Sequence, residues 1–126
     1  MVAADTSSLI AFFEGATGED VQLVDNALQS KQLVMPPVVL TEMLSEPKLA
    51  KEFVKSMLEI PLVGLTEGYW ERAGLSRARI LARGRKARVA DALIAQACID
   101  ERIALISRDK DFLLFASWVP LKVLPG

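Results

Sequence analysis

The sequence predicts an α/β domain in which helices cover both faces of a mostly parallel sheet of about five strands. Short apolar runs with the length of buried strands alternate with helical patterns along the chain, and no repeat, low-complexity tract or linker interrupts them. The 126 residues are 52% hydrophobic, which is enough for one compact core. We therefore expect a single domain over residues 1–126.

The first half of the chain carries strand and helix patterns in alternation. The predicted elements are a strand at residues 1–4, helices at 6–13 and 19–30, a strand at 33–35, helices at 38–45 and 48–58, and a short strand at 61–64. Gly15 ends the first helix. Pro37 suits the first turn of the third helix, because no hydrogen bond from its missing N–H is needed there.

The second half contains two longer helices and two further strands. The predicted elements are helices at 66–83 and 89–102, a strand at 104–107, a short helix that contains residues 112–115, and a last strand at 121–124. Because helices separate the strands throughout, the strands are expected to run parallel, with their carboxyl ends at one edge of the sheet. In such sheets, functional sites form outside the carboxyl ends of the strands.

The composition excludes several kinds of chemistry. The chain has no histidine and a single cysteine, Cys98, so Ser-His-Asp and Cys-His catalysis, zinc sites built from His or several Cys, and an intrachain disulfide are excluded. Carboxylates, hydroxyls, amines and guanidinium groups remain. No apolar run reaches the roughly 18 to 20 residues of a membrane span, and Asp5 interrupts the N-terminal run, so we expect a cytoplasmic protein without a signal peptide.

Two carboxylates follow predicted strands. Asp5 comes directly after the first strand, and Asp109 comes just after the strand at 104–107. If these strands are neighbours, both carboxylates converge on one crevice. Each also has a purely structural interpretation, because Asp5 can cap the helix at 6–13 and either Asp109 or Asp111 can cap the short helix.

Two further acids lie within helices. Asp91 has helical spacing to Ile94 and Cys98, so it heads the apolar stripe that faces the core. A carboxylate there must cap the helix, pair with a cationic side chain or bind a metal ion. Glu42 shares its side of a helix with Ser45, and periodicity alone places it on an ordinary solvated flank.

A basic band precedes Asp91. Positions 77–88 contain no acid but six basic residues, in a chain whose net charge is −1: Arg77, Arg79, Arg83, Arg85, Lys86 and Arg88. Such a band suits contacts to nucleic-acid phosphates, although a solvated helix face gives the same pattern. Its position next to Asp91 favours phosphate contacts, since an acidic pocket alone would repel a nucleic-acid strand.

Four separated motifs occur in order over essentially the whole chain. They are Asp5-Thr6-Ser7 after the first strand, Thr41-Glu42 in "PPVVLTEML", Asp91 in "VADALIAQACI", and Ser107-Arg108-Asp109 in "LISRDKDF". Together they resemble the PIN-domain ribonucleases, and most closely the toxin component of VapBC-type toxin–antitoxin pairs. Each motif alone has low specificity, and the combination carries the resemblance.

The resemblance implies a three-layer α/β/α fold and a metal-dependent endoribonuclease that leaves a 5′-phosphate and a 3′-hydroxyl. The implied catalytic acids are Asp5, Glu42, Asp91 and Asp109, of which Asp5, Asp91 and Asp109 would ligate Mg²⁺ or Mn²⁺. Ser7 and Ser107 would orient carboxylates or a metal-bound water; Ser107 stands where Thr is more usual. Asp111 is an extra acid that competes with Asp109 for the last position. The implied RNA-binding residues are Arg83, Arg85, Lys86 and Arg88.

The chemistry of the acids agrees with this interpretation. Clustered carboxylates repel one another unless a cation neutralises them, and hard oxygen ligands select a hard divalent metal ion. Such an ion presents a hydroxide-like water to a phosphodiester and stabilises the charge that develops on phosphorus. Hydrolysis is then possible without histidine.

The resemblance also implies two protein partners, a small antitoxin and a second copy of the chain in a homodimer. The antitoxin tail would cover apolar clefts and push an arginine into the acidic pocket. The residues that could line such a cleft are Phe12, Phe13, Met43, Trp70 and Trp118. Aromatic and Met residues are more often part of the core.

Three other interpretations compete with the nuclease. A receiver-like phosphoacceptor would have adjacent acids after the first strand, and a dehalogenase-like phosphatase would have a second Asp where Ser7 stands. The third is a PIN-like module that only binds RNA or a protein partner. Metal-dependent cleavage would distinguish the nuclease from such a module.

Overall fold

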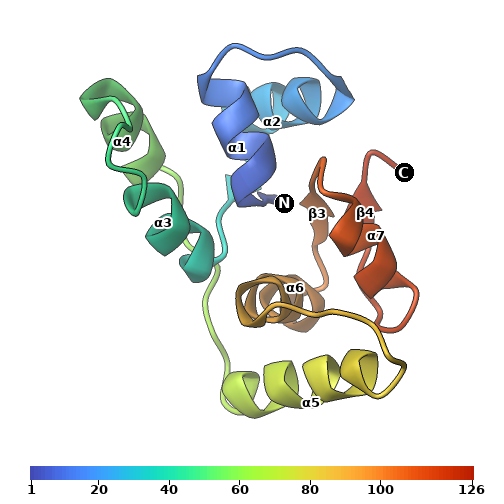
Figure 1. Cartoon of the computed structure of the whole chain (residues 1–126). Coiled ribbons are helices and arrows are strands. Elements are labelled where there is room, and N and C mark those ends of the chain that lie inside the picture. The colour runs from blue at the N-terminus through green and yellow to red at the C-terminus, as the bar shows by residue number, and fades with distance from the viewer.

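A computed structural model describes residues 1–126, and it contains a four-stranded parallel sheet between layers of helices (Figure 1). The strands are β1 (Val2–Ala4), β2 (Leu33–Val34), β3 (Ala104–Ile106) and β4 (Val123–Leu124), in the order β2-β1-β3-β4. All three strand pairs are parallel. The predicted α/β class with three layers is confirmed.

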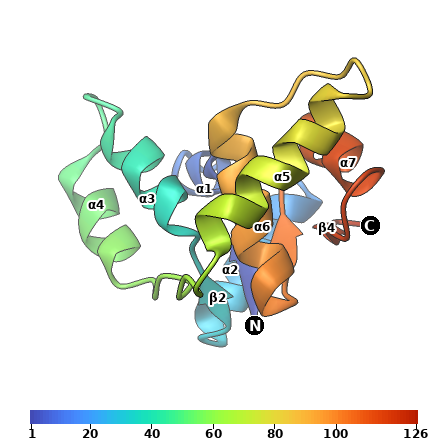
Figure 2. The same cartoon turned by 90° about the horizontal axis from the view of Figure 1, so that it is seen from below.

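Seven helices surround the sheet: α1 (Thr6–Phe13), α2 (Glu19–Gln29), α3 (Pro37–Leu44), α4 (Lys51–Leu58), α5 (Tyr69–Leu81), α6 (Val89–Glu101) and α7 (Lys110–Ala116). In Figure 1, α1 and α2 lie above the strands, and α6 and α5 lie below them. The helix α2 packs on β2 and β3, and α6 packs on β3. Seen from below, α5 crosses the outer face of α6 (Figure 2).

Two segments differ from their predicted structure. Residues 61–64 form a single parallel bridge, between Met35 and Leu62, in place of a fifth strand. The helix predicted to begin at position 66 begins at Tyr69, because Gly68 takes a left-handed conformation with φ of 83° that a regular helix does not allow. Pro37 occupies the first turn of α3 as predicted.

The core is one cluster of 28 buried residues. Ala3 and Ala4 of β1 are fully buried, and their small side chains let the helices approach the central strand. Among the cleft candidates, Met43 lies in the core, and Phe12, Phe13 and Trp118 pack against it while partly buried, whereas Trp70 is 61% exposed. None of the helices has both the length and the apolar character needed to cross a membrane.

Candidate active site

The carboxyl ends of β1 and β3 bring two of the sequence motifs together. Ala4 pairs with Ile106 in the parallel register, so Asp5 and Ser107 are the next residues on neighbouring strands. The Asp5 backbone N–H donates to the Ile106 carbonyl oxygen at 3.0 Å, and the Ser107 hydroxyl donates to Asp5 Oδ2. The two strands are adjacent, as the convergence of Asp5 and Asp109 on one crevice requires.

Asp5 is 2% exposed and is the N-cap of α1, so its capping interpretation is confirmed. Its Oδ1 accepts the Ser8 backbone N–H at 2.9 Å, and the Ser7 hydroxyl lies 2.9 Å from both carboxylate oxygens. Burial raises the pKa of the Asp5 carboxyl, and the hydrogen bonds from Ser107, Ser8 and Ser7 oppose that rise. These three donors fix the orientation of the Asp5 carboxylate.

The turn between β3 and α7 separates the roles of two acids. The Asp109 backbone N–H donates to Ser107 Oγ at 3.0 Å, so one hydroxyl links Asp109 to Asp5. Asp109 is the N-cap of α7 and accepts the Asp111 backbone N–H at 2.9 Å. The Asp111 side chain is 58% exposed and pairs with Arg88. Of the two capping candidates, Asp109 is therefore the cap.

Asp91 lies in the first turn of α6 and is 9% exposed. The N-cap interpretation is wrong for Asp91, because Arg88 occupies the N-cap position. The only ionic partner of Asp91 is Arg88, whose Nε lies 3.6 Å from Oδ2. Burial raises the pKa of the Asp91 carboxyl to about 6; Arg88 opposes the rise, and the charges of Asp109, Asp111 and Glu42 add to it.

Glu42 is exposed, as its helical pattern suggests, but it is not remote from the other acids. The Thr6 hydroxyl donates to Glu42 Oε1 at 2.7 Å, and this bond ties α3 to the start of α1. The periodicity of α3 could not reveal this position, because it depends on how α3 packs against α1 and α6.

All four predicted acids line one hollow of about 250 Å³ at the carboxyl edge of the sheet. Its other lining residues are Thr6, Ser7, Ile10, Arg88, Ile94 and Phe112. Asp111 is not among the lining residues, so Asp109 is the acid from the last motif that faces the hollow. The acids come from the end of β1, from α3, from α6 and from the N-cap of α7.

The donor set fits a hard divalent cation by its chemistry. The polar groups around Asp5 and Asp91 are carboxylates and hydroxyls, the oxygen ligands that Mg²⁺ and Mn²⁺ take. Burial is the main cause of the raised pKa values of Asp5 and Asp91, and a bound cation would stabilise the charged forms that burial disfavours. In this structure, no group of three acidic or cysteine side chains has the arrangement of a metal site.

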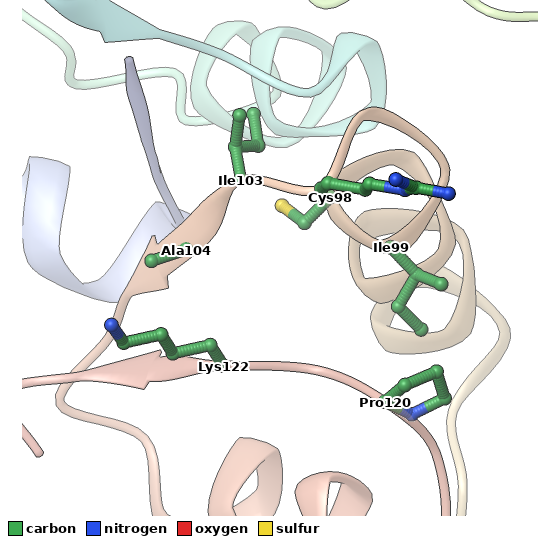
Figure 3. Close-up of a pocket in the computed structure, with 7 residues that line it drawn as sticks. Cys98, Ile99, Ile103, Ala104, Pro120 and Lys122 are labelled. Atoms are coloured by element: carbon green, nitrogen blue, oxygen red, sulfur yellow. The ribbon is translucent and has the colours of Figure 1, made fainter.

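A larger hollow of about 410 Å³, with none of these acids in its lining, lies near the amino end of β3 (Figure 3). Cys98, Ile103 and Ala104 line it, and its only charged lining residues are the cations Arg102 and Lys122. Burial raises the pKa of the Cys98 thiol to about 12, so a thiolate nucleophile does not form there near neutral pH. Although this hollow is larger than the acidic one, its lining offers no catalytic side chains.

Of the predicted basic residues, only Arg88 lines the acidic hollow. Arg85 and Lys86 are exposed on the connection between α5 and α6. The Arg83 guanidinium lies 4.8 Å from the centre of the Trp118 ring, a cation–π contact between this connection and the segment after α7.

The sequence patterns do not predict an ion pair that joins the exposed Arg108 to the buried Asp20. Arg108 donates to both carboxylate oxygens of Asp20, from Nε at 2.8 Å and from Nη2 at 3.0 Å, and the Ser8 hydroxyl donates to Asp20 at 2.9 Å. The Arg108 guanidinium lowers the pKa of the Asp20 carboxyl by hydrogen bonding. The sequence did hold a signal, since Asp20 heads the buried stripe of α2 that continues with Val24 and Ala27.

The comparisons with known proteins agree with this geometry. The family model of the PIN domain matches residues 2–116. No curated protein matches the chain by sequence. Three similar solved structures come from Rickettsia felis, Neisseria gonorrhoeae and Mycobacterium tuberculosis.

The first of these is VapBC2 from Rickettsia felis bound to a DNA fragment from its promoter. It has a TM-score of 0.74 at 15% identity, and the similarity covers 98% of this chain and 97% of that chain. FitAcB from Neisseria gonorrhoeae has a TM-score of 0.68 at 16% identity, with 98% and 96% covered. VapBC-5 from Mycobacterium tuberculosis, a member of the VapBC family of toxin–antitoxin systems, has a TM-score of 0.68 at 16% identity, with 99% and 98% covered.

These identities are low, so the solved structures support the fold, and the family match over most of the chain supports the assignment. The chain belongs to the PIN domain family.

Proposed function

We propose that this protein is a metal-dependent endoribonuclease and the toxin of a toxin–antitoxin pair, acting in the cytoplasm as a single domain over residues 1–126. The observation that carries the proposal is that Asp5, Glu42, Asp91 and Asp109, which come from four separate elements, line one hollow. Membership of the PIN domain family supports the same activity.

The acids would divide the work of binding Mg²⁺ or Mn²⁺. Asp5, Asp91 and Asp109 would hold the ion, which when bound supplies an activated water and neutralises charge on the phosphate. Ser7 and Ser107 fix the orientation of the Asp5 carboxylate through their hydroxyls.

Glu42 and the basic residues would act around this centre. The bond from Thr6 holds Glu42 at the rim, where its carboxylate can accept a proton or orient a water. Arg85, Lys86 and Arg88 would contact phosphates of the RNA strand beside the hollow. Arg83, held over Trp118, would add positive charge to the same connection from a fixed position.

An antitoxin segment would bind an apolar groove that adjoins the acidic hollow. The groove has a volume of about 370 Å³ and is lined by Ile10, Phe13, Met43, Leu49 and Phe53, among others. Ile10 lines both spaces, so a segment in the groove can extend a cationic side chain toward the acids. The similar structure of VapBC-5 from Mycobacterium tuberculosis is of a member of a family of toxin–antitoxin systems, which supports such a partner here. We also propose a homodimer, by analogy with the family.

The proposal is tested by mapping new 5′ ends in purified total cellular RNA after incubation with the protein and Mg²⁺ or Mn²⁺. Total RNA is needed because specificity depends on the folded shape of the substrate. The controls are EDTA and Asp91→Asn, an isosteric change that removes a charge without touching the hydrogen bonds that hold Asp5.

We expect discrete ends bearing 5′-phosphates that disappear with both controls. Ends that persist with both controls would show that the carboxylate mechanism is wrong. If no ends form with a folded, metal-binding protein, the chain is better described as a PIN module that binds RNA or a protein partner without cleaving.

A further inference from the structure

Arg88 is the only basic residue among those that line the acidic hollow. Its guanidinium reaches two acids, with Nε 3.6 Å from Asp91 Oδ2 and Nη2 3.4 Å from Asp111 Oδ2. Asp91 faces the hollow and its side chain is 12% exposed, whereas Asp111 lies outside and its side chain is 58% exposed. Arg88 therefore spans the boundary between the site and the solvent.

Both contacts are long for charged hydrogen bonds. In the same protein, Arg108 meets Asp20 at 2.8 Å and Arg72 meets Asp100 at 2.7 Å. The Arg88 side chain is 73% exposed, so water screens its pairs and little holds it in place. A contact of this kind supplies positive charge to the site and is readily broken.

We propose that Arg88 is a built-in counter-cation that competes with the divalent metal ion for the carboxylates of the hollow. When no ion is bound, the guanidinium offsets the negative charge at Asp91. With a divalent ion held at Asp91, the Arg88 guanidinium would lose this partner, keep only its outer partner Asp111, and be free to contact a phosphate of the RNA. This inference rests on the proposed function, and it adds a coupling between metal binding and the availability of a phosphate contact.

The coupling is tested by measuring Mn²⁺ binding to the full chain by isothermal titration calorimetry. The proteins are the wild type, Arg88→Gln, Arg88→Lys and Arg85→Gln, each checked for folding by circular dichroism. Arg85→Gln removes a charge from the same connection that has no ion pair with an acid, so it controls for long-range electrostatics.

We expect Arg88→Gln to bind Mn²⁺ about two- to fivefold more tightly than the wild type, the range that corresponds to one weak ion pair, the one with Asp91, that the ion no longer has to displace. Arg88→Lys, which keeps the charge, should stay close to the wild type, and Arg85→Gln should change by less than about twofold. At saturating Mn²⁺, Arg88→Gln should raise the KM for RNA, because the phosphate contact is lost.

Two results overturn the inference, and they differ in what they leave standing. Equal or weaker Mn²⁺ binding by Arg88→Gln refutes the competition while the metal-dependent nuclease survives. If neither the wild type nor Arg88→Gln binds Mn²⁺ saturably, the inference and the proposed function both fail.

Discussion

Replacing Asp91 by Asn should stabilise the metal-free protein at neutral pH. In the wild type, burial raises the pKa of the Asp91 carboxyl from 3.8 to about 6, and the amide of Asn removes this ionisable group. A shift of this size corresponds to about 3 kcal/mol of unfavourable free energy in the ionised form. Because the hollow opens to solvent, which screens the charge, we expect a gain of about 1–2 kcal/mol in the free energy of unfolding.

This gain should depend on pH with a definite sign. Between the unfolded pKa of 3.8 and the folded pKa of about 6, the folded protein binds more protons at Asp91 than the unfolded chain does. The stability of the wild type therefore falls, relative to Asp91→Asn, as the pH rises through this window. The two proteins should be about equally stable below the window, and their difference should be constant above it.

Urea unfolding in EDTA, followed by tryptophan fluorescence across this pH range, measures the effect. Asp111→Asn is the matched control: its carboxylate is 58% exposed and lies outside the hollow, so its replacement should change stability by less than about 0.5 kcal/mol. A lower stability of Asp91→Asn at neutral pH, or a gain that does not vary with pH, would refute the reasoning about a buried, repelled carboxylate.

Three further outcomes follow from the same contacts. Ser107→Ala should cost about 2 kcal/mol in urea unfolding, because it removes a donor to the buried Asp5 carboxylate, and Ser107→Thr should restore most of it. Arg108→Leu should lower the stability most above pH 3.8, the ordinary pKa of the Asp20 carboxyl, and progressively less as the pH falls from there through the lowered folded pKa, since protonated Asp20 no longer needs a cation; the same urea unfolding measures it. Mn²⁺ at about one hundred times its dissociation constant should stabilise the wild type by about 2.7 kcal/mol, measured by the same unfolding, and should stabilise Asp91→Asn much less.

The sequence predicts the frame of the fold because strands and helices have distinct apolar periods. The buried strands at both ends of the chain, the intervening helices and the positions of Asp5 and Asp109 after neighbouring strands agree with the structure. The stretch at 61–64 is apolar enough for a strand but makes only one bridge, with Met35. Hydrophobicity alone does not determine how many residues of an edge segment reach the sheet.

The site is less accessible to sequence reasoning because its contacts join distant elements. Glu42 reaches the hollow only through the packing of α3, and its bond to Thr6 spans 36 positions. The pair of Asp20 and Arg108 spans 88 positions, and no local period reports such a contact. Asp91 was detectable, because a carboxylate at the head of a buried stripe needs a compensating partner.

Cleavage rates at one mapped RNA site, compared between Asp91→Asn and Asp111→Asn in saturating Mn²⁺, test the carboxylate mechanism most directly. Both changes neutralise an acid near Arg88, but only Asp91 faces the hollow. We predict a loss of at least about a hundredfold for Asp91→Asn, and a loss of at most about threefold for Asp111→Asn. Equal rates for the two variants would contradict catalysis by the acids of the hollow.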